Sequence, residues 1–190
     1  PTPSDYQEAL QAPAVAFADP DLQSATPRTN ALGLPQPITG SFAAVFPVTT
    51  ATGARYAVKC FLTEAPAQQD RYEAVADALN AIDHDAFVEF RYQPEGIQVR
   101  GEGYPLLKMA WAEGTTLNRF VEKHLDRPEV LDRLATAWAE LMADLEGMDL
   151  APGDLQHGNV LVETAGEALR LRLVDYDTMY VPTLEGRTSA

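Results

Sequence analysis

Cysteine is nearly absent from this sequence of 190 residues, which contains Cys60 alone, so no disulfide can form within the chain. A chain without disulfides is typical of a reducing compartment, and the cytoplasm is the expected location. Cys60 lies in an apolar segment and is expected to be a small buried residue rather than a reactive thiol. No apolar run is long enough to cross a membrane, and no signal-peptide pattern is present.

Basic residues are also scarce, because 14 Lys and Arg accompany 28 Asp and Glu, for a net charge of −14. Nucleic-acid binding depends on Lys and Arg to neutralise phosphates, so no nucleic-acid partner is expected. An anionic membrane surface would repel the same excess of negative charge. The apolar fraction of 46% is enough for a normal packed core.

The first half of the chain is expected to form strands with one helix. Residues 1–37 are rich in Pro and Ala and lack a clear period; one or two helical turns are expected over 5–10, and the rest predicts an irregular arm on the domain or a linker. A helix is predicted over about 66–81, with Tyr72 and Leu79 on its apolar face. The predicted strands lie at 42–48, 55–62, 87–92, 97–100 and 105–111, with a turn at 94–96.

The second half is expected to be mainly helical and to end in a hairpin. A short helix to about residue 125 precedes a long helix over about 128–147. The predicted hairpin pairs 159–163 with 169–175. The apolar stripe of the long helix comprises Leu131, Leu134, Trp138, Leu141, Leu145 and Met148. Strands followed by helices indicate an α+β chain rather than a repeated βαβ unit.

Three polar side chains are brought together by this hairpin and the loop before it. Asn159 begins the first strand and Asp175 ends the second, and antiparallel pairing places these positions at the same end. Asp154 lies in the preceding loop. Asn159 and Asp175 offer the oxygen ligands that Mg²⁺ prefers, and Asp154 is suited to accept a proton from a hydroxyl group. The sequence therefore predicts a magnesium site beside a general base.

An early strand carries a lysine, Lys59, after a turn that contains a glycine. In the protein-kinase pattern such a turn covers the phosphates of ATP, and the strand lysine reaches the α- and β-phosphates. An acid on the next helix positions that lysine; Glu73 is the first candidate, and Asp70 and Asp77 are the alternatives. The turn residues are Gly40, Ser41 and Phe42.

The order of these features resembles the protein-kinase superfamily, most nearly the bacterial eukaryotic-like Ser/Thr kinases. Asp154 and Asn159 have the Asp-x-x-x-x-Asn spacing of the kinase catalytic loop, and Asp175 follows at the position of the metal-binding Asp. The resemblance implies a bilobal fold, with an antiparallel sheet and one helix over 38–112 and a partial helical lobe over 113–190. Only 15 residues, 176–190, follow Asp175 in the sequence, so this lobe is expected to be truncated.

The same resemblance implies a function and the residues that perform it. The chain would bind ATP and Mg²⁺ and transfer the γ-phosphoryl group to a Ser or Thr hydroxyl of a protein substrate. Lys59 would position the phosphates, Asn159 and Asp175 would hold Mg²⁺, and Asp154 would orient the acceptor, which requires Lys59 to face Asp175 across a cleft. Met109 would lie behind the adenine, with backbone hydrogen bonds from Ala110, Trp111 and Ala112.

Several departures from the kinase pattern keep two alternatives open. The departures are Ile38 and Ala43 in place of glycines, Pro152-Gly153 in place of His-Arg, Gln156 in place of Lys, and Asp177 in place of Gly. A phosphate-covering turn with a single glycine is compatible with a non-catalytic, pseudokinase-type scaffold. The pairs Gly153-Asp154 and Asp175-x-Asp177 also resemble small-molecule kinases of the aminoglycoside-phosphotransferase type, with Asp177 as a second metal ligand or a turn residue. A partner or second copy is expected to cover the exposed face of the 128–147 helix.

Overall fold

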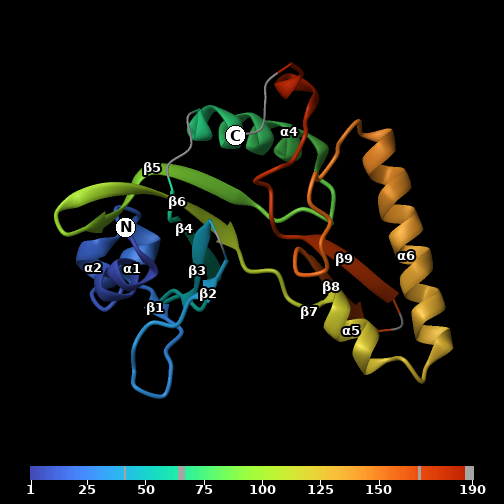
Figure 1. The fold of residues 1–190 in the computed structure, drawn as a ribbon, viewed down its shortest axis with the longest axis horizontal. Coiled ribbons are helices and arrows are strands. Elements are labelled where there is room, and N and C mark those ends of the chain that lie inside the picture. The colour runs from blue at the N-terminus through green and yellow to red at the C-terminus, as the bar shows by residue number, and fades with distance from the viewer. Residues whose placement is uncertain (41, 64–66, 167, 187–190) are drawn as a thin grey trace. The chain divides into compact units, whose positions relative to one another are not determined.

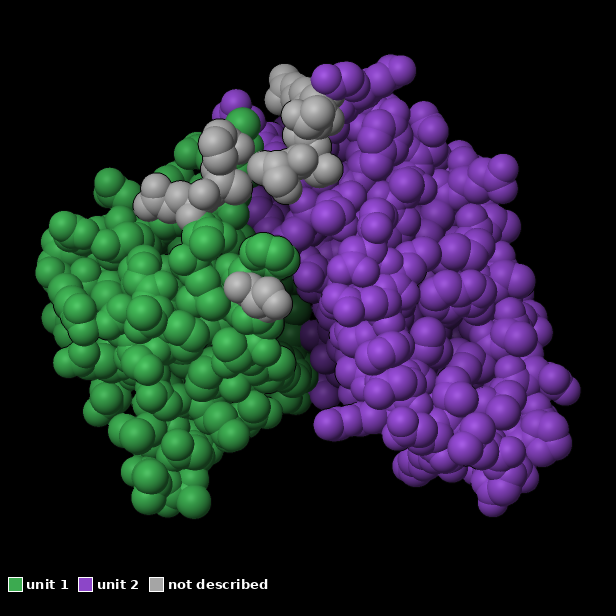
Figure 2. All heavy atoms as spheres, viewed as in Figure 1, with its two compact units in different colours: residues 1–69, 90–111 green, residues 70–89, 112–190 purple. Residues whose placement is uncertain are grey.

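The computed structural model of the protein describes residues 1–40, 42–63, 67–166 and 168–186. The chain forms two compact units, coloured separately in Figure 2. Unit 1 comprises Pro1–Gln69 and Phe90–Trp111, and unit 2 comprises Asp70–Glu89 and Ala112–Ala190. The chain contains both an antiparallel sheet and helices, so the predicted α+β class is confirmed.

Unit 1 is built on an antiparallel sheet in which β4 lies at the centre, between β3 and β6 (Figure 1). The strand order is β1-β3-β4-β6-β5, and β2 also pairs with β3. The strands are β1 (Thr26–Pro27), β2 (Ile38–Thr39), β3 (Ala43–Thr49), β4 (Arg55–Phe61), β5 (Phe90–Val99) and β6 (Glu102–Ala110). The β-branched and aromatic residues of β3 and β4 favour extended backbone, and the turn between them contains Gly53 at a φ of +86°.

The predicted turn at 94–96 is wrong, because these residues form an irregularity inside one long strand, β5. The Gly96 carbonyl accepts a hydrogen bond of 3.1 Å from the N–H of Ala18. A Cβ atom at Gly96 would lie 2.5 Å from Cγ of Leu106, so glycine permits this close approach of the backbone. The bulged strand therefore finds a distant partner in the N-terminal segment, and no local turn signal could reveal that contact.

The N-terminal segment is folded into three short helices, each with a proline in its first turn. These are α1 (Pro3–Ala9), α2 (Pro13–Ala16) and α3 (Pro20–Gln23). Thr2 and Asp5 form a reciprocal capping box at the start of α1. The helical turns expected over 5–10 lie within α1 and its C-cap. The period of 3.6 residues is hard to detect in helices as short as α2 and α3, which is why the sequence predicted an irregular segment there.

These helices complete the core of unit 1, so residues 1–25 are part of the folded unit and the linker alternative is wrong. The Tyr6 hydroxyl donates a 2.7 Å hydrogen bond to the Phe61 carbonyl at the end of β4. The buried residues of this core are Tyr6, Leu10, Ala16, Phe17, Leu22, Ala25, Ala44, Phe46, Val48, Val58, Cys60, Ile97, Val99 and Leu106. Cys60 is fully buried, as predicted, and burial raises the pKa of its thiol.

Unit 2 combines helices with a three-stranded sheet of order β7-β8-β9. Its elements are α4 (Gln68–Ile82), β7 (Thr115–Thr116), α5 (Leu117–Lys123), α6 (Pro128–Gly147), β8 (Val160–Ala165), β9 (Ala168–Leu173) and the 3₁₀-helix η1 (Pro182–Leu184). Most of α4 belongs to this unit, although its first two residues are assigned to unit 1. The predicted start of this helix at residue 66 lies outside the described residues.

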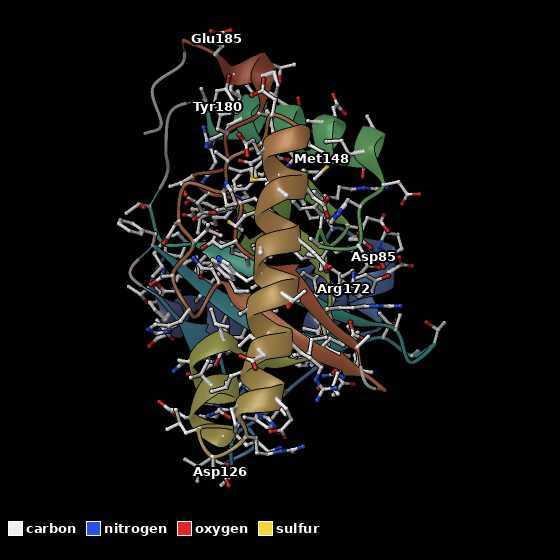
Figure 3. The ribbon with its side chains drawn as sticks, turned by 90° about the vertical axis from the view of Figure 1, so that its right-hand side faces the viewer. Asp85, Asp126, Met148, Arg172, Tyr180 and Glu185 are labelled. Carbon is white, nitrogen blue, oxygen red and sulfur yellow. The ribbon has the colours of Figure 1, made fainter. Side chains whose placement is uncertain are left out.

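Helix α6 packs against β9, and it runs alongside the hairpin that carries Arg172 (Figure 3). Its apolar stripe is only partly covered. Val130, Leu134, Leu141 and Leu145 are buried, whereas Leu131, Trp138 and Met148 are half-buried. Within the described ranges, no helix has both the length and the apolar character required to cross a membrane.

Candidate functional site

The three polar residues predicted to converge in unit 2 lie at one end of the β8–β9 hairpin. Val160 is paired with Leu173, and the Val174 N–H donates a 3.1 Å hydrogen bond to the Asn159 carbonyl. Asn159 and Asp175 are therefore at the same end of the two strands, as antiparallel pairing predicts. This geometry follows from the register and does not depend on the rotamer of either side chain.

The Asp154 carboxylate is oriented by side chains from its own loop. The Asn159 amide donates to Asp154 Oδ2 at 3.1 Å and to the Asp154 carbonyl at 3.3 Å. The Gln156 amide donates to the same Oδ2 at 3.0 Å, and the Gln156 N–H donates to Oδ1 at 3.3 Å. Asp154 itself is exposed. The residue that replaces the usual kinase lysine therefore holds the candidate base in place.

The donor set at this end of the hairpin fits Mg²⁺. Nδ2 of the Asn159 amide faces Asp154, so its oxygen, Oδ1, is directed to the other side of the amide group. Together with a carboxylate from Asp175, this offers the hard oxygen ligands that Mg²⁺ binds, with water and phosphate completing the shell. No cluster of three or more His, Cys, Asp or Glu that could hold a metal ion occurs in the described part of the chain.

Lys59 lies on the face of the unit 1 sheet opposite the N-terminal helices. It is paired with Val45 on β3 and with Leu107 on β6, whereas its neighbours Val58 and Cys60 point into the core described above. The side chain is largely buried, with 6% of the residue exposed. A lysine is rarely this buried without partners, so this position differs from the solvated edge of an ordinary surface sheet.

Met109 shares the face of Lys59. It is paired with Ala57, two residues before Lys59 on the same strand, and directly paired residues have side chains on the same face. Met109 is buried, with 5% of the residue exposed. Lys59, the predicted phosphate-binding residue, and Met109, predicted to lie behind the adenine, are therefore on the same face of the unit 1 sheet.

The stretch predicted to bind adenine by its backbone is at the exit from unit 1. The Trp111 N–H donates a 3.1 Å hydrogen bond to the Arg55 carbonyl, so this donor is already used. The Arg55 guanidinium lies 4.7 Å from the centre of the Trp111 ring, a cation–π contact that fixes the same residue. Binding of adenine by Ala110, Trp111 and Ala112 stays a prediction.

The predicted phosphate-covering turn is described in part. Gly40 donates its N–H to the Ala43 carbonyl at 2.9 Å, and its φ is not in the left-handed region. Phe42 is 70% exposed, and its carbonyl accepts a 2.9 Å hydrogen bond from Leu62 N–H. Ser41 lies outside the described residues. The turn is therefore closed by backbone hydrogen bonds rather than by a run of glycines.

The structure does not test the predicted pairing of Lys59 with an acid on α4. Glu73 is exposed on α4 and belongs to unit 2, whereas Lys59 belongs to unit 1. The pairing of Lys59 with Glu73, and the facing of Lys59 toward Asp175, stay predictions.

The start of the Asp154 loop packs tightly against the segment that follows Asp175. Gly153 has a φ of +72°, and a Cβ atom there would lie 2.2 Å from the Thr178 carbonyl oxygen. The Thr178 hydroxyl donates a 3.1 Å hydrogen bond to the Pro152 carbonyl. Gly153 therefore stands where kinases have Arg because a side chain would push these two segments apart.

Substituting Gly153 by Ala is expected to lower the free energy of unfolding by more than about 2 kcal/mol, because a left-handed backbone and a contact with a carbonyl oxygen are both unfavourable. Gly53→Ala is the control, since Gly53 has a φ of +86° but nothing within 4 Å of its Cβ position. Urea denaturation measures both variants. If the two variants lose the same free energy of unfolding, the close approach of Gly153 to Thr178 contributes nothing to the cost of the substitution.

Sequence patterns missed two sets of contacts in unit 2. Gln156 was recognised as a departure from the kinase lysine, yet its hydrogen bonds to Asp154 were not predicted. Arg71 and Tyr72 of α4 bind the segment after Asp175, although the sequence suggested only that Tyr72 is buried. The contacts of Arg71 and Tyr72 have no local sequence signal, because their partners lie more than 100 residues away. The contact of Gln156 spans only two residues, but it depends on the conformation of the loop.

Comparison with known proteins identifies the fold. No protein-family model and no curated protein matches the sequence. The three-dimensional arrangement, in contrast, is that of a protein kinase domain, so the predicted kinase-like fold is confirmed. One similar solved structure is the kinase domain of maize SIRK1, the sucrose-induced receptor kinase 1, bound to AMP-PNP, with a TM-score of 0.57 and 16% identity. The match covers 87% of this chain and 57% of the maize domain.

Proposed function

We propose that this chain binds ATP with Mg²⁺ and transfers the γ-phosphoryl group to a Ser or Thr hydroxyl of a protein. The observation that carries the proposal is the hydrogen-bonded pair of Asp154 and Asn159, at the same hairpin end as Asp175, within a kinase-like fold. An ATP analogue is bound to the similar maize kinase domain, which supports ATP as the ligand here. The availability of ATP in the cytoplasm favours that location.

Each unit contributes one part of the proposed chemistry. From unit 1, Lys59 would bind the α- and β-phosphates, and Met109 with Ala110 and Ala112 would bind the adenine. From unit 2, Asn159 and Asp175 would hold Mg²⁺, which when bound neutralises negative charge on the phosphates. Catalysis of this kind depends mainly on alignment and on electrostatic stabilisation.

Asp154 would act on the acceptor hydroxyl. Its carboxylate is held by Asn159 and Gln156, so one oxygen can be directed at an incoming hydroxyl group. The acceptor oxygen would bond to the γ-phosphorus while the bond from that phosphorus to the β,γ-bridging oxygen breaks. Asp154 would accept the hydroxyl proton, and ADP would leave. The absence of the usual lysine at Gln156 predicts a slower transfer than in kinases that have it.

Further protein is proposed to cover one edge of α6. Leu131 and Trp138, two turns apart on the helix, remain half-buried along that edge, which is unusual for large apolar side chains of one stripe. A partner protein or a second copy of the chain would bury them. Sedimentation equilibrium distinguishes the two, because a monomeric chain at all concentrations would exclude the second copy.

Nucleotide binding is tested by thermal unfolding. Saturating ATP with Mg²⁺ is expected to raise Tm by about 5–10 °C, since a ligand at a hundred times its Kd stabilises by about 2.7 kcal/mol. The shift should be lost in Lys59→Met and in Asp175→Ala. The control variants Lys123→Met and Asp132→Ala remove exposed charges elsewhere and should retain it.

The outcomes separate the proposed function from its alternatives. A wild-type chain that shows no shift with ATP and Mg²⁺ would contradict the proposal. Binding without any transfer of radiolabel would favour the non-catalytic, pseudokinase-type module. Transfer to a small hydroxylated compound but not to protein would favour the aminoglycoside-phosphotransferase type.

A further inference from the structure

Two neighbouring residues of α4, Arg71 and Tyr72, bind the segment that follows Asp175, which passes alongside α4 (Figure 1). Arg71 Nε donates to the Asp177 carbonyl at 2.8 Å, and a terminal nitrogen of the same guanidinium donates to the Met179 carbonyl at 2.7 Å. The Tyr72 hydroxyl donates to the Asp177 carboxylate. All of these residues belong to unit 2, so the contacts are internal to one compact unit.

Asp177 connects these contacts to Asp175. Its N–H donates a 3.1 Å hydrogen bond to Oδ1 of Asp175, while its own carboxylate accepts from Tyr72. Tyr72 is buried, with 2% of the residue exposed. Burial, and next the negative charge of Asp177, raise the pKa of the Tyr72 phenol, so it stays protonated and remains a donor. A continuous set of hydrogen bonds therefore runs from α4 to the Asp175 carboxylate.

Tyr176, which lies between Asp175 and Asp177, is also fixed by hydrogen bonds. The Val88 N–H donates to the Tyr176 hydroxyl at 2.8 Å, and that hydroxyl donates to the Leu173 carbonyl at 2.8 Å. Tyr176 is buried, with 1% of the residue exposed. The chain following α4 thus fixes Tyr176, and α4 itself fixes Asp177 and Met179.

We propose that Arg71 and Tyr72 are positioning residues that set the Asp175 carboxylate for Mg²⁺, an inference that rests on the proposed function. In this proposal the role of Asp177 is to accept the hydrogen bond from Tyr72 through Oδ1, rather than to be a second metal ligand or a plain turn residue. Asp177, at the position of the usual kinase glycine, therefore links α4 by hydrogen bonds to Asp175, the proposed metal ligand. Groups that orient a metal ligand typically alter metal affinity by about 10- to 100-fold when removed.

The test is a titration of Mg²⁺ at saturating ATP, with Tm as the readout, in wild type, Tyr72→Phe, Arg71→Met and Asp177→Gly. The Mg²⁺ concentration at half-maximal stabilisation is expected to rise about tenfold or more in each variant. Affinity for ADP in EDTA, where Asp175 has no metal to bind, should not change. Arg71→Lys keeps the charge but cannot reach both carbonyls, so its midpoint should lie between those of wild type and Arg71→Met.

Two control variants match these changes. Tyr104→Phe removes another hydroxyl that donates to a carboxylate, that of Glu102, but in unit 1. Asn80→Ala changes an exposed residue of α4 itself. Both should keep the wild-type Mg²⁺ midpoint.

The results distinguish failure of this inference from failure of the proposed function. A wild-type midpoint in Tyr72→Phe together with a raised midpoint in Asp177→Gly would overturn it and make Asp177 a metal ligand. A loss of ADP affinity in EDTA as large as the rise in the Mg²⁺ midpoint would also overturn this inference, because the variants would then act on the whole unit rather than on the metal ligand. If wild type itself shows no Mg²⁺-dependent stabilisation, the proposed function fails, and this inference fails with it.

Discussion

Asp154→Asn is expected to lower kcat for phosphoryl transfer by about 10²- to 10⁴-fold, the usual contribution of a general base. Asparagine keeps the size of the side chain and can still accept from Asn159, but it cannot take up the hydroxyl proton. Nucleotide-dependent stabilisation should therefore persist, because Asp154 is not a proposed ligand of ATP or Mg²⁺. ADP production and radiolabel transfer measure the rate, and the Tm shift with ATP and Mg²⁺ measures binding.

Asp149→Asn is the matched control for this variant. Asp149 is an exposed acid shortly before the same loop, and its φ of +55° is one that asparagine tolerates. It should keep the wild-type rate. A wild-type rate in Asp154→Asn would remove Asp154 from the mechanism, and equal losses in both variants would point to a general disturbance of the loop.

Asp19→Ala is expected to lower the free energy of unfolding of unit 1 by about 1.5–3 kcal/mol, because it removes the more deeply buried of the two carboxylates that contact Lys108. Lys108 Nζ lies 3.0 Å from Asp19 Oδ2, and the two side chains are only 12% and 10% exposed. Gln93 also donates to Asp19 at 2.7 Å, and Lys108 lies 4.6 Å from the centre of the Tyr56 ring. The ion pair between Asp19 and Lys108 links the N-cap of α3 to strand β6 of the sheet.

Asp21→Ala provides the control, since Asp21 contacts the same Lys108 at 2.9 Å but is 68% exposed. Its loss should cost at most about 1 kcal/mol, as for other solvent-screened pairs. Urea denaturation at pH 7 compares the two variants. Equal effects would show that the burial of Asp19 adds nothing to the strength of the pair.

The effect of Asp19→Ala should also depend on pH. Burial alone would raise the pKa of Asp19, but hydrogen bonds from Lys108, Gln93 and the Asp21 N–H outweigh it and hold the pKa below the ordinary 3.8. The stabilisation is thus present above pH 3.8 and is lost as the pH falls through the lower, folded-state value. Burial would lower the pKa of Lys108, but its partners Asp21 and Asp19 raise it above 10.5, so the pair persists until strongly alkaline pH. The difference between wild type and variant should shrink in acid.

The sequence predicted those parts of the fold in which one local pattern dominates. An apolar run and the turn residues after it located β3 and β4, and the apolar period of α6 located the long helix to within a residue. Antiparallel pairing was enough to bring Asn159 and Asp175 to the same hairpin end. These features depend on neighbours in sequence, so their physical causes are visible in the sequence itself.

The parts that the sequence did not predict depend on contacts between distant segments. The helices α2 and α3 are too short for a period to appear, and they are stabilised by burial against the sheet rather than by propensity. Residues 94–96 contain turn formers, yet pairing with Ala18 keeps them inside β5. Arg71 was not singled out, because its role depends on two carbonyl groups more than 100 residues away.

The chain passes between its two compact units three times, after residues 69, 89 and 111. No single cut can therefore release either unit as one uninterrupted fragment. A fragment that ends at 111 would carry residues 70–89 without the segment after Asp175, to which Arg71 and Val88 are hydrogen-bonded. A fragment that begins at 112 would lack Arg71, Tyr72 and Val88 altogether. To produce either unit alone, its two stretches of sequence would have to be joined by a new linker. Fragments obtained by a single cut are expected to misfold.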